Sequence, residues 1–191
     1  MTENYHAPQE GPATVSVFVE SNIKFDFTQA SSAFEYQTEL ASLTGASATT
    51  RNTFWPGIDF HIQDTETSAI WLEVKNWDPA YIEPERRSDS QQSFLSKINS
   101  NAFAREMREK FLGTSAFFAW AGRKLPDNVH YLLMFEPPQP LDSALVLAFG
   151  HKVKQILSPP KLLPWCNRIN VCALTLSDWN KRYPDYTAVK L

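Results

Sequence analysis

The chain has 191 residues, 43% of them apolar and 20% charged, which excludes wholesale disorder, and its two cysteines are too few for a disulfide framework or a four-thiolate zinc site. No apolar run approaches the ~20 residues that cross a bilayer, and the first residues lack the regions of a signal peptide, so we expect a soluble, cytoplasmic protein with no membrane partner. The net charge is −3, but the first 96 residues carry −9 and the remainder +6. This division suits carboxylates that hold a cation beside a basic surface for a polyanion, and equally an uneven, solvated surface.

The N-terminal region predicts a flexible tail over residues 1–13, ahead of one domain over residues 14–191. Apolar residues then alternate on both sides of Ser21-Asn22, which is the pattern of two short strands joined by a tight turn. We therefore expect a hairpin from Val15 to Phe27.

A helix is expected from Ala30 to Leu43, with Gly45 ending it. The clearest local signal follows, because every second residue over 58–63 is apolar. Over residues 70–75 the same parity separates Ile70, Leu72 and Val74 from Trp71, Glu73 and Lys75. Residues 64–68, which lie between these two stretches, are polar, and five residues is an ordinary length for a hairpin loop. The pattern predicts a second hairpin.

The rest of the chain predicts a mixture of helices and strands. In order, we expect a polar loop over 78–91, a helix over 91–112 weakened near 99–101, a strand over 130–135, a helix over 141–157, a strand over 169–176 and a short capped helix over 177–182. The aromatic residues of this last helix are expected to pack inward, as a cap on the sheet. Helices and strands on one core indicate an α/β or α+β layer fold.

The second hairpin brings charged residues together. If its loop is symmetric, Gln63 faces Ala69 and Asp59 faces Glu73, and directly opposed side chains lie ~5 Å apart on one face of a sheet. Lys75 shares that face because side chains alternate along a strand. The other face is uniformly apolar and is expected to be the core: Ile58, Phe60, Ile62, Ile70, Leu72 and Val74.

Two opposed carboxylates destabilise a sheet unless a positive charge neutralises them. Lys75 alone could do so, in a surface salt-bridge cluster worth at most ~1 kcal/mol. A divalent cation such as Mg²⁺ is the other solution, because it takes a couple of carboxylate oxygens and completes its shell with water and substrate phosphate. Both solutions remain open at this point.

Asp59, the short hairpin and Glu73-Val74-Lys75 resemble the restriction-endonuclease-like PD-(D/E)XK nuclease superfamily over roughly residues 29–136. The resemblance implies a three-layer α/β fold with an α-β-β-β-α-β core and a mixed central sheet. To this core the chain would add the N-terminal hairpin and a C-terminal helix-strand-helix extension. The sequence departs from the family pattern because Pro56 does not directly precede Asp59, and because the first core strand is poorly visible between Gly45 and Pro56.

The resemblance also implies roles for residues. Asp59 and Glu73, with the backbone carbonyl of Val74, would hold Mg²⁺ or Mn²⁺, Lys75 would be the catalytic lysine, and Glu35 on the first helix would be an auxiliary acid. The expected activity is metal-dependent endonucleolytic hydrolysis of phosphodiester bonds in DNA. Many such nucleases dimerise, so a homodimer is a further possibility.

A polar stripe on the expected helix over 91–112 could contact nucleic-acid phosphates. Its residues fall within an arc of ~80°: Lys97, Asn101, Arg105 and Arg108. An ordinary solvated helix face explains the stripe equally well. Arg86-Arg87 is a weaker candidate for the same role.

Other polar and aromatic residues near the expected site have plain structural explanations. Glu39 could replace Glu35, since the two lie about one turn apart on the expected helix. His61 and Gln63 share the face of Asp59, and a hydrogen-bonded histidine without a catalytic role is the favoured interpretation. Trp77 could stack on a base, but a rim aromatic that covers apolar surface is more usual.

Two alternatives to a nuclease stay open. The first is a catalytically silent protein of the nuclease fold that binds nucleic acid or recruits partners. The second is an unrelated α/β interaction domain in which Asp59, Glu73 and Lys75 form a salt bridge only. Measurements of metal binding and of metal-dependent cleavage distinguish these two alternatives from a nuclease.

Overall fold

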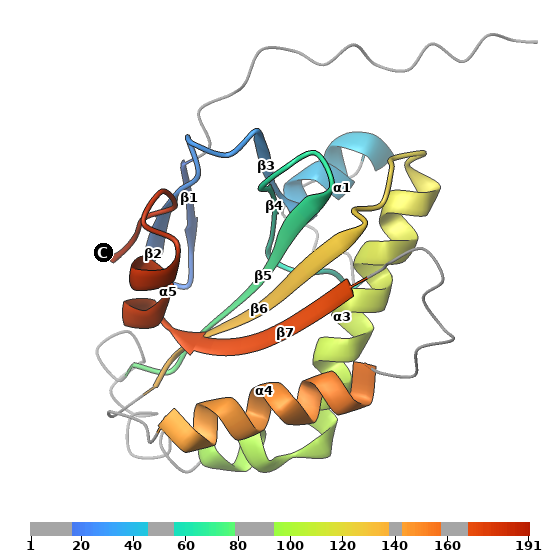
Figure 1. Cartoon of the computed structure of the whole chain (residues 1–191). Coiled ribbons are helices and arrows are strands. Elements are labelled where there is room, and N and C mark those ends of the chain that lie inside the picture. The colour runs from blue at the N-terminus through green and yellow to red at the C-terminus, as the bar shows by residue number, and fades with distance from the viewer. Residues whose placement is uncertain (1–16, 46–55, 79–93, 138–142, 158–167) are drawn as a thin grey trace, which may run out of the picture.

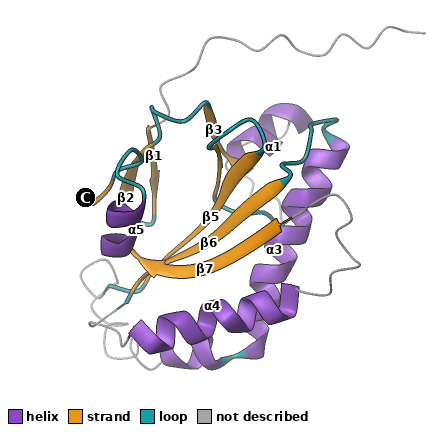
Figure 2. Cartoon of the chain, in the orientation of Figure 1, coloured by secondary structure: helices purple, strands orange, loops and turns teal. Residues whose placement is uncertain are grey.

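The computed structural model describes residues 17–45, 56–78, 94–137, 143–157 and 168–191 (Figures 1 and 2). The strands are β1 (Val17–Glu20), β2 (Ile23–Asp26), β3 (Ser32–Glu35), β4 (Phe60–Gln63), β5 (Ser68–Asn76), β6 (Asn128–Glu136), β7 (Arg168–Thr175) and β8 (Ala188–Lys190). The helices are α1 (Tyr36–Thr44), α3 (Asn101–Trp120), α4 (Ser143–Leu157) and α5 (Leu176–Arg182), and residues 94–99 are also helical. The expected tail, residues 46–55 between Gly45 and Pro56, and most of the 78–91 loop lie outside these ranges.

Two sheets and their helices form three layers. The five-stranded sheet has the order β3-β4-β5-β6-β7, antiparallel from β3 to β5 and parallel from β5 to β7. Helices α1, α3 and α4 pack on one face of it, and the antiparallel sheet β1-β2-β8 with α5 packs on the other (Figure 1). The mixed α/β class and the mixed central sheet expected from the sequence are confirmed.

The central strands are buried on both faces, so the sequence interpretation with a single core face was wrong. Phe60, Ile62 and Leu72 face the small sheet, as expected, but Trp71 on the opposite face is also fully buried. Such burial is the rule where parallel strands lie between two layers. The charged face of the second hairpin therefore lies under α3 and not in open solvent.

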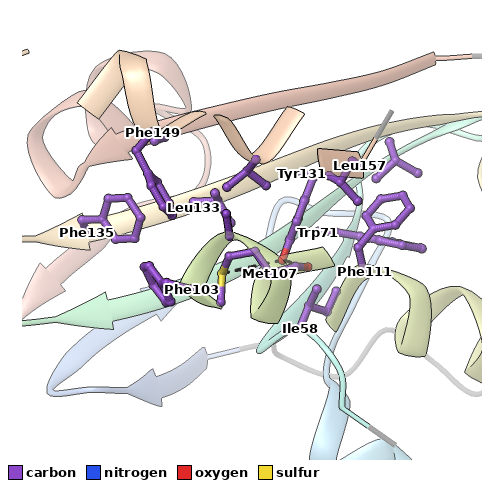
Figure 3. Close-up of a cluster of buried hydrophobic side chains, with 14 of the residues drawn as sticks. Ile58, Trp71, Phe103, Met107, Phe111, Tyr131, Leu133, Phe135, Phe149 and Leu157 are labelled. Carbon is purple, nitrogen blue, oxygen red and sulfur yellow. Dashed lines mark hydrogen bonds between the residues drawn. The ribbon is translucent and has the colours of Figure 1, made fainter. Parts of the chain in front are cut away.

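Figure 3 shows the helix-side core, in which side chains of α3 and α4 meet those of β5 and β6. The rings of Trp71 and Phe111 lie 4.9 Å apart, and those of Phe111 and Tyr131 lie 5.4 Å apart. The buried Tyr131 hydroxyl donates a hydrogen bond to the Met107 carbonyl at 2.9 Å. These contacts fix α3 in place over β5 and β6.

The register predicted for the second hairpin is confirmed along the β4–β5 ladder, but the predicted pairing of Asp59 directly opposite Glu73 is not formed. Gln63 pairs with Ala69, and the ladder continues to Phe60 opposite Leu72. There it ends irregularly, because the Asp59 N–H also donates to the Leu72 carbonyl at 3.0 Å, so that two residues oppose one, as in a β-bulge. This bulge explains why Ile58 packs on the helix side, away from Phe60, although regular alternation predicted one face for both.

The segment expected to begin the first helix is a strand. Ser32-Ala33-Phe34-Glu35 forms β3, the edge strand that pairs with β4, and the helix begins only at Tyr36. The Phe34 ring stacks on His61 at 4.8 Å, a cross-strand contact that a helix would not make. Strand therefore precedes helix here, the reverse of the order that the resemblance implied, while Gly45 does end α1, as expected.

Most of the other predicted elements are present. The N-terminal hairpin turns at Ser21 and Asn22, which both have positive φ, as a tight I′-type turn requires. The long helix breaks at Ser100, whose side chain accepts the Ala102 N–H and caps α3, and α3 then continues to Trp120 instead of ending near residue 112. Capping of α5 comes from Thr175, with a capping box to Asp178.

The C-terminal region adds more to the fold than the expected extension. β7 joins the central sheet beside β6, and β8, which was not expected, completes the small sheet beside β2. Lys190 forms ion pairs with Asp78 at 2.8 Å and with Glu136 at 2.6 Å, which link the last strand to the ends of β5 and β6. None of the helices in the described part of the chain combines the length and the apolar character that a bilayer crossing needs.

Candidate active site

Four charged side chains from three structural elements meet on the helix side of β5. Asp59 comes from the bulge before β4, Glu73 and Lys75 from β5, and Lys110 from α3. Two carboxylates and two amines thus form one cluster with balanced formal charge. The sequence predicted three of the four.

Glu73 is the centre of the cluster and is completely buried. Its Oε1 atom lies 2.5 Å from the Nζ atoms of both Lys75 and Lys110. Its Oε2 atom is buried and has no hydrogen-bond partner. An unpaired buried acceptor costs roughly 1–3 kcal/mol, and more when the group is charged. The fold therefore holds Glu73 with one carboxylate oxygen still able to accept a hydrogen bond or bind a cation.

Asp59 is oriented by the backbone of β5. Its Oδ2 atom accepts the Val74 N–H at 2.7 Å, just beyond the point where the β4 ladder ends. Its Oδ1 atom lies 3.7 Å from Lys110 Nζ, and its side chain is 18% exposed. Burial, with the charge of Glu73 as a second cause, raises the pKa of Asp59 to about 7, although the lysines oppose this. The two carboxylates are therefore close enough to affect each other.

Lys75 lies at the open side of the cluster. Its side chain is 28% exposed, more than any of the other three charged groups. Burial alone would lower the pKa of Lys75, but Glu73 and Asp59 hold it above the ordinary lysine value. Lys75 therefore stays an ammonium group at neutral pH, with one side toward Glu73 and one toward solvent.

Lys110 was missed by the sequence interpretation, which considered only the outward-facing polar stripe of this helix. A signal was present, because Phe103, Met107, Lys110 and Thr114 recur at the spacing of one buried helix face. A lysine on an otherwise buried face needs a carboxylate partner, and here it has two.

The close approach of α3 to the segment before Asp59 positions Lys110. The Thr114 hydroxyl accepts the Ile58 N–H at 3.1 Å, and a Cβ atom on Gly113 would lie 1.8 Å from the Pro56 carbonyl oxygen. Only glycine permits this contact between two backbones.

Gly113→Ala is therefore expected to destabilise the protein by about 1–3 kcal/mol, although alanine favours helices, because α3 must move away from Pro56. Urea unfolding of Gly113→Ala measures the loss, and Glu109→Ala, an exposed change on the same helix, is the control. Equal stability of Gly113→Ala and the unchanged chain would contradict this packing.

The structure does not bring Glu35 into the cluster, which corrects the helix position predicted for it. Glu35 ends β3, and its Oε2 atom accepts the Thr38 hydroxyl at 2.6 Å in the first turn of α1. Glu39, the alternative acid, forms an ion pair with Arg123. Within the described ranges, no set of three or more acidic, histidine or cysteine side chains is arranged to hold a metal ion.

His61 is a structural histidine, as favoured from the sequence. It is buried, its Nδ1 atom accepts the Trp71 indole N–H at 3.0 Å, and its Nε2 atom lies 3.2 Å from Gln63 Oε1. Burial lowers the pKa of His61 to about 3, so the ring is neutral. Trp77 is also buried, against Phe94 and other core rings, and is not placed to stack on a base.

The polar stripe is divided between two helical segments. Lys97 is exposed on residues 94–99, while Asn101 and Arg105 are exposed and Arg108 is half-buried on α3. The break at Ser100 separates them, so the single arc predicted from an unbroken helix is not preserved. Arg86-Arg87 lies outside the described residues.

The chemistry of the cluster fits a hard divalent cation. Mg²⁺ needs only one or two carboxylates from the protein, and the free, buried Glu73 Oε2 atom has no other partner. The N–H and C=O groups of a strand residue point to the same side. Since the Val74 N–H reaches Asp59, the Val74 carbonyl is expected at the same edge, where it could add a third oxygen.

Comparisons with protein-family models, with curated proteins and with solved structures found no match to this chain. Its function is therefore argued from the cluster of Asp59, Glu73, Lys75 and Lys110.

Proposed function

We propose that this protein hydrolyses phosphodiester bonds of DNA with the help of Mg²⁺ or Mn²⁺. One observation carries the proposal: the buried Glu73, which shares the Lys110 ammonium with Asp59, keeps one carboxylate oxygen unpartnered, with a second ammonium group at the exposed side. A structural salt bridge alone would not need to leave that oxygen without a partner.

Each residue of the cluster has its own role in the proposed reaction. Asp59, Glu73 and the Val74 carbonyl hold the cation, which when bound supplies a Lewis acid and an acidified water. Lys75 orients the attacking water and stabilises the negative charge that grows on the phosphate. Its partial exposure allows it to meet a substrate that approaches from solvent, whereas Glu73 is wholly enclosed.

We also propose that the five-stranded sheet is a variant of the restriction-endonuclease-like core. In support, antiparallel β4 and β5 carry Asp59 and the Glu73-Val74-Lys75 run, and α3 then leads to β6, which is parallel to β5. The variant has its first helix after the edge strand β3 instead of before it. Glu35 consequently has no auxiliary role in this proposal.

DNA phosphates would be contacted from the solvent side of α3. Arg105 and Arg108 supply the charge there, Asn101 a neutral hydrogen-bond donor, and Lys97 extends the surface along the preceding helical segment. Such contacts position a substrate without reading its sequence.

A second function has an observation in its favour. Lys75 and Lys110 already balance the two carboxylates, so the cluster is electrically complete without a cation. This favours a catalytically silent nucleic-acid-binding or recruiting protein, or an interaction domain with a salt bridge, over an enzyme. Cation binding and cleavage separate these alternatives from the nuclease.

The test is incubation of the purified chain with supercoiled plasmid in Mg²⁺, Mn²⁺, Ca²⁺ or EDTA, with single-stranded DNA and RNA in parallel. We expect nicking in Mg²⁺ or Mn²⁺ and none in EDTA. Linear product without a nicked intermediate would indicate a dimer that cuts both strands. Cleavage that persists in EDTA, or intact substrates under all conditions, would contradict the proposal.

A further inference from the structure

One lysine spans both carboxylates of the cluster. Lys110 Nζ lies 2.5 Å from Glu73 Oε1 and 3.7 Å from Asp59 Oδ1, whereas the ion pair of Lys75 in this cluster is with Glu73. An ammonium between two carboxylates occupies the region where a chelated cation would be attracted most strongly. Lys110 and a cation bound between the same two carboxylates would therefore repel each other.

Lys110 has a route out of this position. Its side chain is 18% exposed, and the flexible four-carbon stem of a lysine can carry its head group toward solvent. Glu106 lies one turn earlier on the same helix and is exposed, and the spacing from glutamate to a lysine four residues later is the favourable one for a helical ion pair. The charge of Glu106 also helps to raise the pKa of Lys75 and of Tyr131, so its field reaches the cluster.

We propose that Lys110 is a resident counter-ion: it holds Asp59 and Glu73 together in the metal-free protein, and a divalent cation displaces it toward Glu106. The inference rests on the proposed function, because it assumes that the carboxylates bind a cation. It adds that Lys110 weakens cation affinity, whereas a lysine that merely supports the site would strengthen it.

The test measures Mn²⁺ binding to the full chain by calorimetry, with Lys110→Met compared with the unchanged protein. Removal of the competing ammonium is expected to tighten Mn²⁺ binding about tenfold. Without metal, Lys110→Met is expected to have a lower melting temperature than the unchanged chain. Addition of Mn²⁺ should raise the melting temperature of Lys110→Met by more than it raises that of the unchanged chain. Lys124→Met, at an exposed lysine beyond the end of α3, is the matched control and should bind Mn²⁺ like the unchanged chain.

Glu106→Gln provides a second variant that leaves the four-residue cluster in place. Loss of the alternative partner of Lys110 is expected to weaken Mn²⁺ binding about twofold to threefold, and Glu109→Gln, also exposed on α3, is its control. If Lys110→Met does not fold, the Mn²⁺ affinity of Glu106→Gln alone tests the counter-ion role of Lys110.

The outcomes separate the two proposals. Equal or weaker Mn²⁺ affinity in Lys110→Met, or unchanged affinity in Glu106→Gln, overturns the counter-ion role and leaves the proposed nuclease standing. Absence of Mn²⁺ binding in every folded variant, the unchanged chain included, overturns both.

Discussion

Lys75→Met is expected to slow Mg²⁺-dependent plasmid nicking about 100-fold to 1000-fold, while the protein stays folded and still binds Mn²⁺. Methionine keeps the apolar part of the lysine side chain and removes only the ammonium group. The loss of one positioned donor to the developing charge typically has an effect of this size. Because Asp59 and Glu73 remain, the binding of the cation is separated from the chemical step.

The measurement is the initial rate of nicking at saturating Mg²⁺, with Lys124→Met as the matched control at an exposed lysine. The control should cleave like the unchanged protein. If Lys75→Met retains full activity, Lys75 is not the catalytic lysine, and Lys110 would be the remaining amine of the cluster.

Trp179→Ala is expected to destabilise the protein by about 3–5 kcal/mol, the usual cost of removing a large, fully buried aromatic side chain. Trp179 on α5 lies in the core between the two sheets, where the centroid of its ring is 6.3 Å from that of Phe25 and 4.8 Å from that of Tyr183. Its indole N–H donates to the Tyr186 carbonyl at 2.5 Å. The substitution leaves a cavity and an unpaired carbonyl together.

Urea unfolding measures this loss, and Trp120→Ala provides the same chemical change at a side chain that is 53% exposed. The control should lose less than about 1 kcal/mol. A similar loss in both variants would contradict the view that α5 closes the core of the small sheet.

The part of the site on the second hairpin could be predicted because it depends on local rules. The alternation of the two strands and the five-residue loop predicted the pairing of Gln63 with Ala69, and the same alternation placed Glu73 and Lys75 on one face.

The bulge at Asp59 was not visible in the sequence, and the residues around it make long-range contacts. The Asp59 carbonyl accepts the Tyr36 N–H of α1, and the Ile58 N–H donates to the Thr114 hydroxyl of α3. The bulge nevertheless left Asp59 beside the backbone of β5.

The part of the site that depends on tertiary contacts was missed or wrong. Ser32–Glu35 has few residues that decide between helix and strand, and pairing with β4 decides for strand, which removes Glu35 from the site. Lys110 lies 37 residues after Glu73, and only the packing of α3 across β5 joins them. The pairing of β8 with β2 is a similar long-range contact.

The central claim is that Asp59 and Glu73 together hold a divalent cation. A crystal of the protein grown with Mn²⁺ tests this most directly, through its anomalous difference density. We predict a peak in contact with Glu73 Oε2 and an Asp59 oxygen, with the Lys110 ammonium moved away from both carboxylates. A crystal grown at saturating Mn²⁺ with no peak there, and with Lys110 still between the two carboxylates, would contradict the account.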